Sequence, residues 1–222
     1  MFREAFEFYK DVIKPPAARL EQARCVVDSL KDYPFGDHVE VIETGASHDI
    51  NDGCFGLFLG YAANKMYSVD INKENIENSK KTYYEFLPEL DISHHIGDSA
   101  MFLKGYSGQA TIVHLDSFDL NLKNPIPSML HGFLEFQELE HKMPIGSYII
   151  IDDNYLKGSW VDWNLLSSGI ITETERIDIS YDIIGKGSLI YHYCKEDRSN
   201  WKIIGDHYKP GKNVKLIIQK IR

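Results

Sequence analysis

Few cysteines, a shortage of basic residues and the lack of a long apolar run characterise this sequence of 222 residues. Its three cysteines, Cys25, Cys54 and Cys194, are odd in number and far apart, which predicts reduced, buried thiols rather than a disulfide framework or a zinc site. Reduced thiols indicate a cytoplasmic protein. No apolar segment approaches the roughly 20 residues that span a bilayer, and the first residues lack a signal-peptide pattern, so no membrane association is expected.

Basic residues are outnumbered by acidic ones, 24 against 33, which gives a formal net charge of −9. A negative surface repels phosphate backbones, and the sequence contains no basic patch, so nucleic acid is not an expected partner. Hydrophobic residues make up 43% of the chain and charged residues 26%, as in ordinary soluble globular proteins. The length predicts one α/β domain over 1–222, made of an N-terminal helical cap (1–35) and a core (39–222).

The stretch from Val39 to Asp70 reads as a strand, a polar loop, a helix and a second strand. Its first apolar run ends at Glu-Thr-Gly-Ala-Ser (43–47), which is typical of a buried parallel strand that opens into a tight turn. Asp70 ends the second strand beside that turn, where its carboxylate could accept hydrogen bonds from two ribose hydroxyls. The unit therefore predicts a nucleoside site, although an ordinary strand–helix–strand unit with a charged loop is the alternative.

The loop after the first strand is acidic, with Glu43, Asp49 and Asp52, and lacks the Gly-x-Gly-x-x-Gly spacing of a pyrophosphate site. This charge is suited to a cationic ligand such as S-adenosylmethionine, which carries an ammonium and a sulfonium. Its carboxylate could bind at the start of the following helix, near Gly53.

Helices and strands alternate along most of the remaining chain. Helical spacing predicts two N-terminal helices, which run to Leu30 and are divided by Pro15 and Pro16. The last two predicted strands form an antiparallel hairpin, and 170–184 cannot be assigned. The pattern therefore predicts a doubly wound, mostly parallel, Rossmann-like sheet of seven strands with a C-terminal antiparallel hairpin. The predicted elements after Asp70 are helices at 72–86, 126–142 and 188–195, and strands at 92–98, 110–116, 146–152, 201–208 and 214–221.

Five short motifs follow one another in a fixed order: 43–47, 69–70, 97–99, 115–117 and 151–154. In this order and spacing the chain from 39 to 158 resembles the class I S-adenosylmethionine-dependent methyltransferases. Within that class it is most similar to the metal-dependent O-methyltransferases of small molecules, of the catechol and sugar-modifying types. The resemblance implies these cofactor-binding residues: Glu43, Gly45, Ala46, Ser47, Gly53, Asp70, Ile71, Asp98 and Ser99.

The same subgroup holds a divalent metal with an acid after the fourth strand and a pair of polar residues after the fifth. The resemblance therefore implies a metal at Asp116 with two of Asp152, Asp153 and Asn154. Three hard oxygen ligands are suited to Mg²⁺ or another octahedral cation, which would lower the pKa of a substrate hydroxyl. Two registers after the fifth strand remain open, and acids that simply solvate strand ends are the alternative.

The resemblance places the general base at Asp119, where relatives have lysine or histidine. A carboxylate is a weak base unless desolvation raises its pKa, which leaves Asp116 and Asp119 as catalytic candidates. Histidine alternatives are His48, His114 and His131. Among them, His131 shares a helix face with Glu135, which predicts a structural contact; His114 is expected in the core, and His48 beside a ligand.

The expected function is transfer of a methyl group from S-adenosylmethionine to a hydroxyl of a small sugar or aromatic acceptor, assisted by Mg²⁺. One alternative is a metal-free N- or O-methyltransferase, and another is a non-catalytic nucleoside-binding module on the same fold. Sensitivity to a chelator separates the first two, and formation of S-adenosylhomocysteine separates both from the third. Trp160 and Trp163 are candidates for stacking on an acceptor ring or for simple core packing. A homo-oligomer is compatible with the sequence.

Overall fold

The computed structural model describes residues 1–222 except 48, 122–123, 157–182, 197–198 and 205–213. Its main element is a mixed sheet with strand order β3-β2-β1-β4-β5-β8-β7, in which β6 additionally pairs with β5. The strands are β1 (Glu40–Thr44), β2 (Lys65–Asp70), β3 (Asp91–Ile96), β4 (Ile112–Leu115), β5 (Tyr148–Leu156), β6 (Ile183–Gly185), β7 (Trp201–Ile203) and β8 (Val214–Lys220). The helices are α1 (Phe2–Phe8), α2 (Ala17–Ser29), α3 (Phe55–Ala62), α4 (Lys73–Phe86), α5 (Ser99–Gly105), α6 (Ile126–Glu140) and α8 (Ser188–Lys195), with a π-helical turn at Tyr9–Ile13 and a 3₁₀ turn at Ile50–Asp52.

The sheet has a parallel half and an antiparallel edge, as the sequence predicts. β1 pairs in parallel with β2 and β4, β2 with β3, and β4 with β5. The last strand, β8, runs antiparallel to both β5 and β7. The carboxyl ends of β1, β2, β4 and β5 therefore meet at one edge of the sheet, where ligands bind in open α/β sheets.

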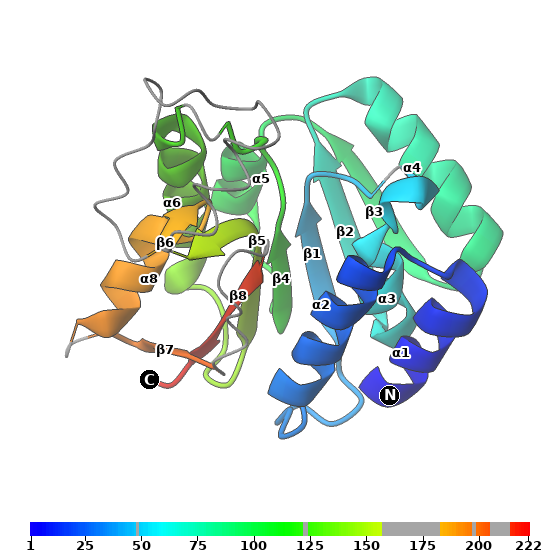
Figure 1. Ribbon diagram of the computed structural model, residues 1–222, viewed down its shortest axis with the longest axis horizontal. Coiled ribbons are helices and arrows are strands. Elements are labelled where there is room, and N and C mark those ends of the chain that lie inside the picture. Colours follow the sequence, from blue (N-terminus) through cyan, green and yellow to red (C-terminus); the bar gives the residue numbers. More distant parts are fainter. Residues whose placement is uncertain (48, 122–123, 157–182, 197–198, 205–213) are drawn as a thin grey trace.

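Helices cover both faces of the sheet (Figure 1). Alternating strand residues explain this arrangement, because neighbouring side chains point to opposite faces. Val41 and Ile150 belong to the core on the face covered by α1, α2, α3 and α4. Ile42, Ile149 and Ile151 belong to the core on the face covered by α5, α6 and α8. Both faces are apolar, which is characteristic of parallel strands buried on two sides.

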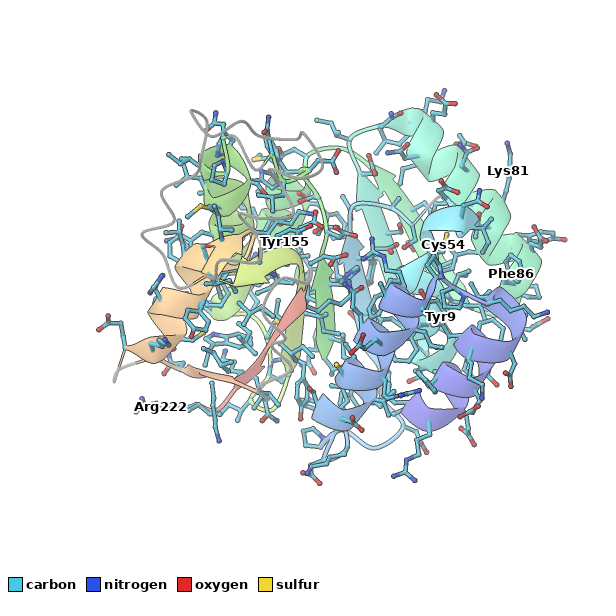
Figure 2. All side chains as sticks on the ribbon, viewed as in Figure 1. Tyr9, Cys54, Lys81, Phe86, Tyr155 and Arg222 are labelled. Atoms are coloured by element: carbon cyan, nitrogen blue, oxygen red, sulfur yellow. The ribbon has the colours of Figure 1, made fainter. Side chains whose placement is uncertain are left out.

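The N-terminal cap consists of two helical segments separated by Pro15 and Pro16, as the sequence predicts. The first segment stops at Lys14, whose φ is 55°, and α2 starts directly after Pro16. Tyr9 and Val26 are completely buried. Tyr9 packs in the same core as Cys54, on one side of the sheet (Figure 2).

Within the described residues the sheet has eight strands, one more than the seven predicted from the sequence. The additional strand, β6, is three residues long and pairs antiparallel with the end of β5. Three residues are too few to establish a period, which is why the pattern does not reveal it. The predicted positions of Trp160, Trp163, His48 and the turn of the C-terminal hairpin lie outside the described residues.

Candidate functional site

A cavity of about 820 Å³ opens at the carboxyl edge of the parallel strands. Loops after β1, β2, β3 and β4 contribute to its wall, together with Asp153 from β5 and Arg19 from α2. The predicted site residues that line it are Gly45, Ala46, Ser47, Asp70, Ile71, Asp98, Ser99, Asp116, Asp119 and Asp153. Glu43, Gly53, Asp152 and Asn154 are outside the lining.

Gly45 forms the turn at the end of β1, with φ of +82°. A Cβ at this position would lie 2.3 Å from the carbonyl oxygen of Asp116, so β1 and β4 can approach only because the residue is glycine. The Gly45 N–H donates to the carbonyl of Val69 at 2.8 Å, which ties the turn to β2. The backbone of Asp116, directly after β4, therefore requires a glycine at position 45. A side chain at this position would displace that backbone whether or not a ligand is bound.

Asp70 ends β2 with its carboxylate beside the turn. Oδ2 accepts hydrogen bonds from the Ala46 N–H at 3.0 Å and from Asn75 Nδ2 at 3.2 Å, and Oδ1 accepts from the Asn72 N–H at 2.7 Å. Each carboxylate oxygen can accept more than one bond, so this set orients the group and leaves capacity for ligand hydroxyls.

Glu43 is completely buried behind the turn instead of facing the cavity. Its carboxylate accepts hydrogen bonds from the hydroxyls of Ser47, Ser68 and Tyr83, the last two at 3.0 and 3.2 Å. Burial raises the pKa of Glu43, and the hydroxyl donors oppose that rise. The Glu43 carboxylate therefore stabilises the turn through its hydrogen bond with Ser47.

Gly53 is the other predicted cofactor-binding residue outside the lining of the cavity. Its φ is +96°, and it precedes α3. Its carbonyl accepts a hydrogen bond of 2.6 Å from the buried hydroxyl of Tyr9. The N-terminal helical segment therefore holds the far end of the loop that follows β1.

Asp116 and Asp153 line the cavity and share one buried cation, Lys186. Lys186 Nζ lies 2.7 Å from Asp116 Oδ1 and 3.0 Å from Asp153 Oδ2. Burial and the neighbouring Asp152 raise the pKa of Asp116 to about 7, whereas Lys186 opposes the rise. Burial alone would lower the pKa of Lys186, but the two carboxylates raise it above its usual value, so the ammonium stays charged.

Asp152 lies deeper and is paired with two other cations. Its Oδ2 is 2.7 Å from Arg19 Nη1 and 2.8 Å from Lys215 Nζ. Burial alone would raise the pKa of Asp152, but Lys215 and Arg19 hold it well below its usual value. Lys215 Nζ is also 3.0 Å from Nε2 of His114, whose pKa is lowered by burial, so the imidazole is neutral.

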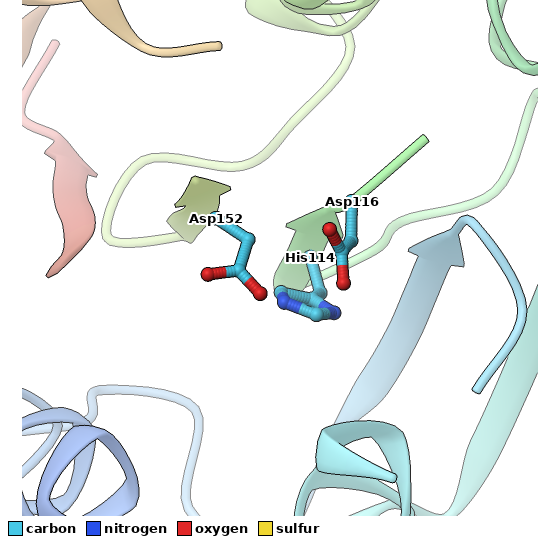
Figure 3. Close-up of side chains that lie close together, drawn as sticks. All are labelled: His114, Asp116 and Asp152. Carbon is cyan, nitrogen blue, oxygen red and sulfur yellow. The ribbon is translucent and has the colours of Figure 1, made fainter. Parts of the chain in front are cut away.

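His114, Asp116 and Asp152 converge from β4 and β5 (Figure 3), with one potential ligand atom each within 4.8 Å of one another. These donors do not fit a divalent metal, because ammonium or guanidinium groups already lie against them. Asn154 does not fit either. It is completely buried, its amide nitrogen donates to the carbonyls of Ile151 and Asp152 at 2.9 Å, and its oxygen accepts from the Gly187 N–H at 2.7 Å.

The contact between His131 and Glu135 that the helical spacing predicts is confirmed, with Nε2 and Oε1 3.7 Å apart. Glu135 also accepts a hydrogen bond of 2.7 Å from the Ser117 hydroxyl, and it raises the pKa of His131. His131 Nε2 lies 3.1 Å from the Ser99 hydroxyl and its ring stacks on Phe118. His131 therefore joins three elements at one wall of the cavity. The prediction that His114 is buried is also confirmed.

Three cations that pair with these aspartates, Arg19, Lys186 and Lys215, are absent from the residues inferred from the sequence. Two of them had a signal. Lys186 lies between two glycines, and Lys215 stands in β8 between Val214 and the buried apolar run Leu216–Ile218. A lysine in such a strand must find a buried carboxylate. Nothing in the sequence around Arg19 distinguishes it from other helix-surface arginines.

No protein-family model matches the sequence, and no curated protein sequence matches it. Solved structures do match in fold. An S-adenosylmethionine-dependent methyltransferase from Clostridium acetobutylicum superposes with a TM-score of 0.60 at 10% identity, covering 99% of this chain and 98% of the other. An rRNA methylase from Streptococcus thermophilus gives a TM-score of 0.56 at 10% identity, with coverage of 90% and 97%.

Among the helices that the structure describes, none combines the length and apolarity needed to cross a membrane.

A third neighbour is the O-methyltransferase TomG from Streptomyces achromogenes, solved with S-adenosylmethionine, with a TM-score of 0.55 at 11% identity and coverage of 99% and 88%. At these identities the similarity concerns the fold, and the chain adopts the fold of S-adenosylmethionine-dependent methyltransferases of known structure.

Proposed function

We propose that this chain transfers a methyl group from S-adenosylmethionine to a small-molecule acceptor. The observation that carries the proposal is Asp70, whose carboxylate is oriented by three hydrogen bonds beside the turn at Gly45, inside a cavity of about 820 Å³. An acid at the end of the second strand is where a ribose binds in nucleoside-binding α/β folds. The fold similarity to a methyltransferase solved with S-adenosylmethionine supports the same assignment.

The charge of the cavity supports a cationic ligand. Six of its lining residues are aspartates, Asp49, Asp70, Asp98, Asp116, Asp119 and Asp153, against the one guanidinium of Arg19 in the lining and the ammonium of Lys186 behind Asp116 and Asp153. Carboxylates of one sign in a recess concentrate cations and repel anions. The sulfonium and ammonium of the cofactor suit such a wall, and the same field disfavours an acceptor that carries phosphate.

The chain's own residues divide the cavity into two parts. Asp70 would accept the ribose hydroxyls, and the neighbouring Ile71, 77% exposed, offers an apolar surface to the base. Asp116 and Asp119 would face the acceptor and are the candidates for accepting its proton. S-adenosylmethionine, when bound, supplies the electrophilic methyl group; the protein contributes mainly by orienting the two molecules.

Of the two methyltransferase forms that the sequence suggests, the donor set favours the metal-free form. Every carboxylate proposed as a metal ligand carries a lysine or arginine within 3.0 Å. We therefore assign no step to Mg²⁺, and the acceptor atom is an oxygen or a nitrogen of a small molecule.

The first test is the affinity for S-adenosylhomocysteine, measured by isothermal titration calorimetry. Asp70→Ala removes a charged acceptor, at a cost of about 1.5–3 kcal/mol for each bond lost, so the Kd should rise at least about tenfold. Asp91→Ala, a change at the exposed first residue of β3, should leave the Kd unchanged. Equal affinities of the wild type and Asp70→Ala would refute the ribose assignment.

A second measurement separates an enzyme from a binding module. Incubation with S-adenosylmethionine and pools of small hydroxylated or amine acceptors should yield S-adenosylhomocysteine in the presence of a strong chelator. Binding without turnover on any acceptor would leave the nucleoside-binding module as the better description.

A further inference from the structure

Lys186 occupies the place at which the fourth and fifth strands present their acids. It follows β6 and precedes α8, and its side chain is 2% exposed, whereas the carboxylates of Asp116 and Asp153 that it bridges are 30% and 25% exposed. Both aspartates line the cavity. The ammonium therefore lies behind two carboxylates that face the acceptor side.

The backbone around Lys186 is fixed by three glycines. A Cβ on Gly185, whose φ is +136°, would lie 1.9 Å from the carbonyl oxygen of Asp153. A Cβ on Gly132 of α6 would lie 2.5 Å from the carbonyl oxygen of Lys186, and one on Gly187 would lie 2.8 Å from Asn154 Oδ1. Because the chain passes this closely between β5 and α6, the lysine is built into the site and is not a surface side chain that has folded inward.

Among the described residues, the charged side chains at this edge balance in number without an added ion. Three carboxylates, Asp116, Asp152 and Asp153, are in contact with three cations, Arg19, Lys186 and Lys215. A divalent cation placed among these carboxylates would be repelled by the adjacent ammonium groups or would have to displace them.

We propose that the ammonium of Lys186 takes the structural place of a divalent cation in this site, holding Asp116 and Asp153 together and oriented toward the acceptor. Lys186 is thus a positioning residue, and its assignment to an acceptor site rests on the proposed function. Without the ammonium, two like charges would share one recess and attract a metal ion instead.

Manganese binding tests the proposal, because it is measured without any cofactor or acceptor. The wild type should show no saturable 1:1 binding of Mn²⁺ up to 1 mM by calorimetry and electron paramagnetic resonance. Its Tm should not change with Mn²⁺ or Mg²⁺. A Kd of 1 mM corresponds to a binding free energy of about −4.1 kcal/mol. Lys186→Ala should gain a 1:1 Mn²⁺ site whose Kd is at least about tenfold below this 1 mM limit. Asp116→Asn in the Lys186→Ala background should remove that site.

Two control variants make the result specific. Lys186→Arg keeps the charge and should gain no site, and Lys202→Ala, an exposed change on β7, should behave as the wild type. If Lys186→Ala does not fold, as judged by circular dichroism, the wild-type titration decides. Saturable Mn²⁺ binding by the wild type that Asp116→Asn abolishes would overturn the proposal, and so would a folded Lys186→Ala that binds no metal.

Titration of S-adenosylhomocysteine into the same proteins distinguishes the two proposals. No binding by the wild type would refute the proposed function and leave the metal result standing. Normal binding together with a wild-type metal site would refute the role of Lys186 alone.

Discussion

At the scale of single residues, the acid of the first motif, Glu43, lies behind the turn and outside the lining of the cavity. Its carboxylate is completely buried and accepts from the hydroxyls of Ser47, Ser68 and Tyr83. Ser47 in turn accepts from the Gly56 N–H at 3.0 Å, so the acid connects the turn after β1 to the first turn of α3. A hydroxyl can rotate to donate or accept, which lets this network tolerate either protonation state.

Glu43→Gln tests the protonation state of this carboxyl. Because burial raises its pKa above 4.5, the folded protein binds one more proton than the unfolded chain between 4.5 and the raised value. The stability of the wild type should therefore fall as pH rises through this window, by up to about 1.4 kcal/mol per pH unit. Glu43→Gln should lose the part of this slope that Glu43 contributes, while the part from the raised pKa of Asp116 remains, and it should be at least as stable as the wild type at pH 7.5.

Urea denaturation between pH 4.5 and 8 measures the slope, and Glu85→Gln, an exposed change on α4, is the matched control. A Gln variant that is much less stable at pH 7.5, with the wild-type slope retained, would show that the folded state requires the ionised carboxylate.

At the scale of elements, the N-terminal helices serve the site as well as the core. Arg19 of α2 pairs with Asp152 of β5, and Tyr9 donates to the carbonyl of Gly53 at the start of α3. The N-terminal cap is thus hydrogen-bonded to the loop before α3 and ion-paired with β5. The cap lies on the side of the sheet that carries α3, where α1 and α2 pack beside α3 (Figure 1).

Tyr9→Phe removes the hydroxyl and leaves the Gly53 carbonyl without this partner in a buried place. The free energy of unfolding should fall by about 1–3 kcal/mol, the usual cost of a buried acceptor that loses its bond. We expect the affinity for S-adenosylhomocysteine to fall several-fold, since the loop between β1 and α3 loses one support. Urea denaturation and calorimetry measure the two effects. Tyr84→Phe, at a tyrosine 79% exposed, should change neither; unchanged stability of Tyr9→Phe would show that the contact contributes little.

At the scale of the whole molecule, the net charge leads us to propose an acceptor other than nucleic acid. The chain has a formal net charge of −9, and the cavity is lined by six aspartates. One neighbour in fold is an rRNA methylase, so fold similarity by itself leaves RNA open as an acceptor. Binding to a phosphate backbone depends on lysine and arginine contacts, which this surface charge opposes.

A direct binding measurement tests that conclusion. Fluorescence anisotropy with a labelled single-stranded RNA of about 20 nucleotides should show no binding at micromolar protein, even at about 50 mM salt, where phosphate contacts are strongest. Poly-lysine-coated beads, which attract acidic proteins, serve as the positive control for charge. Tight, salt-dependent RNA binding would contradict the small-molecule assignment and make RNA the acceptor to examine first.

The sequence by itself predicts the order of the elements, apart from the short α5 and β6, and the positions of the acids at the strand ends. Both follow from local rules: the two-residue period of strands, the helical period, and the backbone limits of proline and glycine at Pro15, Pro16 and Gly45. The antiparallel hairpin at the end of the chain is predictable for the same reason.

Only the tertiary structure decides which charges those acids meet. Asp152 is paired with Arg19, 133 residues away, and Asp116 with Lys186, 70 residues away. A buried carboxylate is stable as an anion only when a distant element brings a cation to it, and no local period records that pairing. The sequence therefore predicts three acids at one edge of the sheet, and the fold brings lysine and arginine side chains into contact with them.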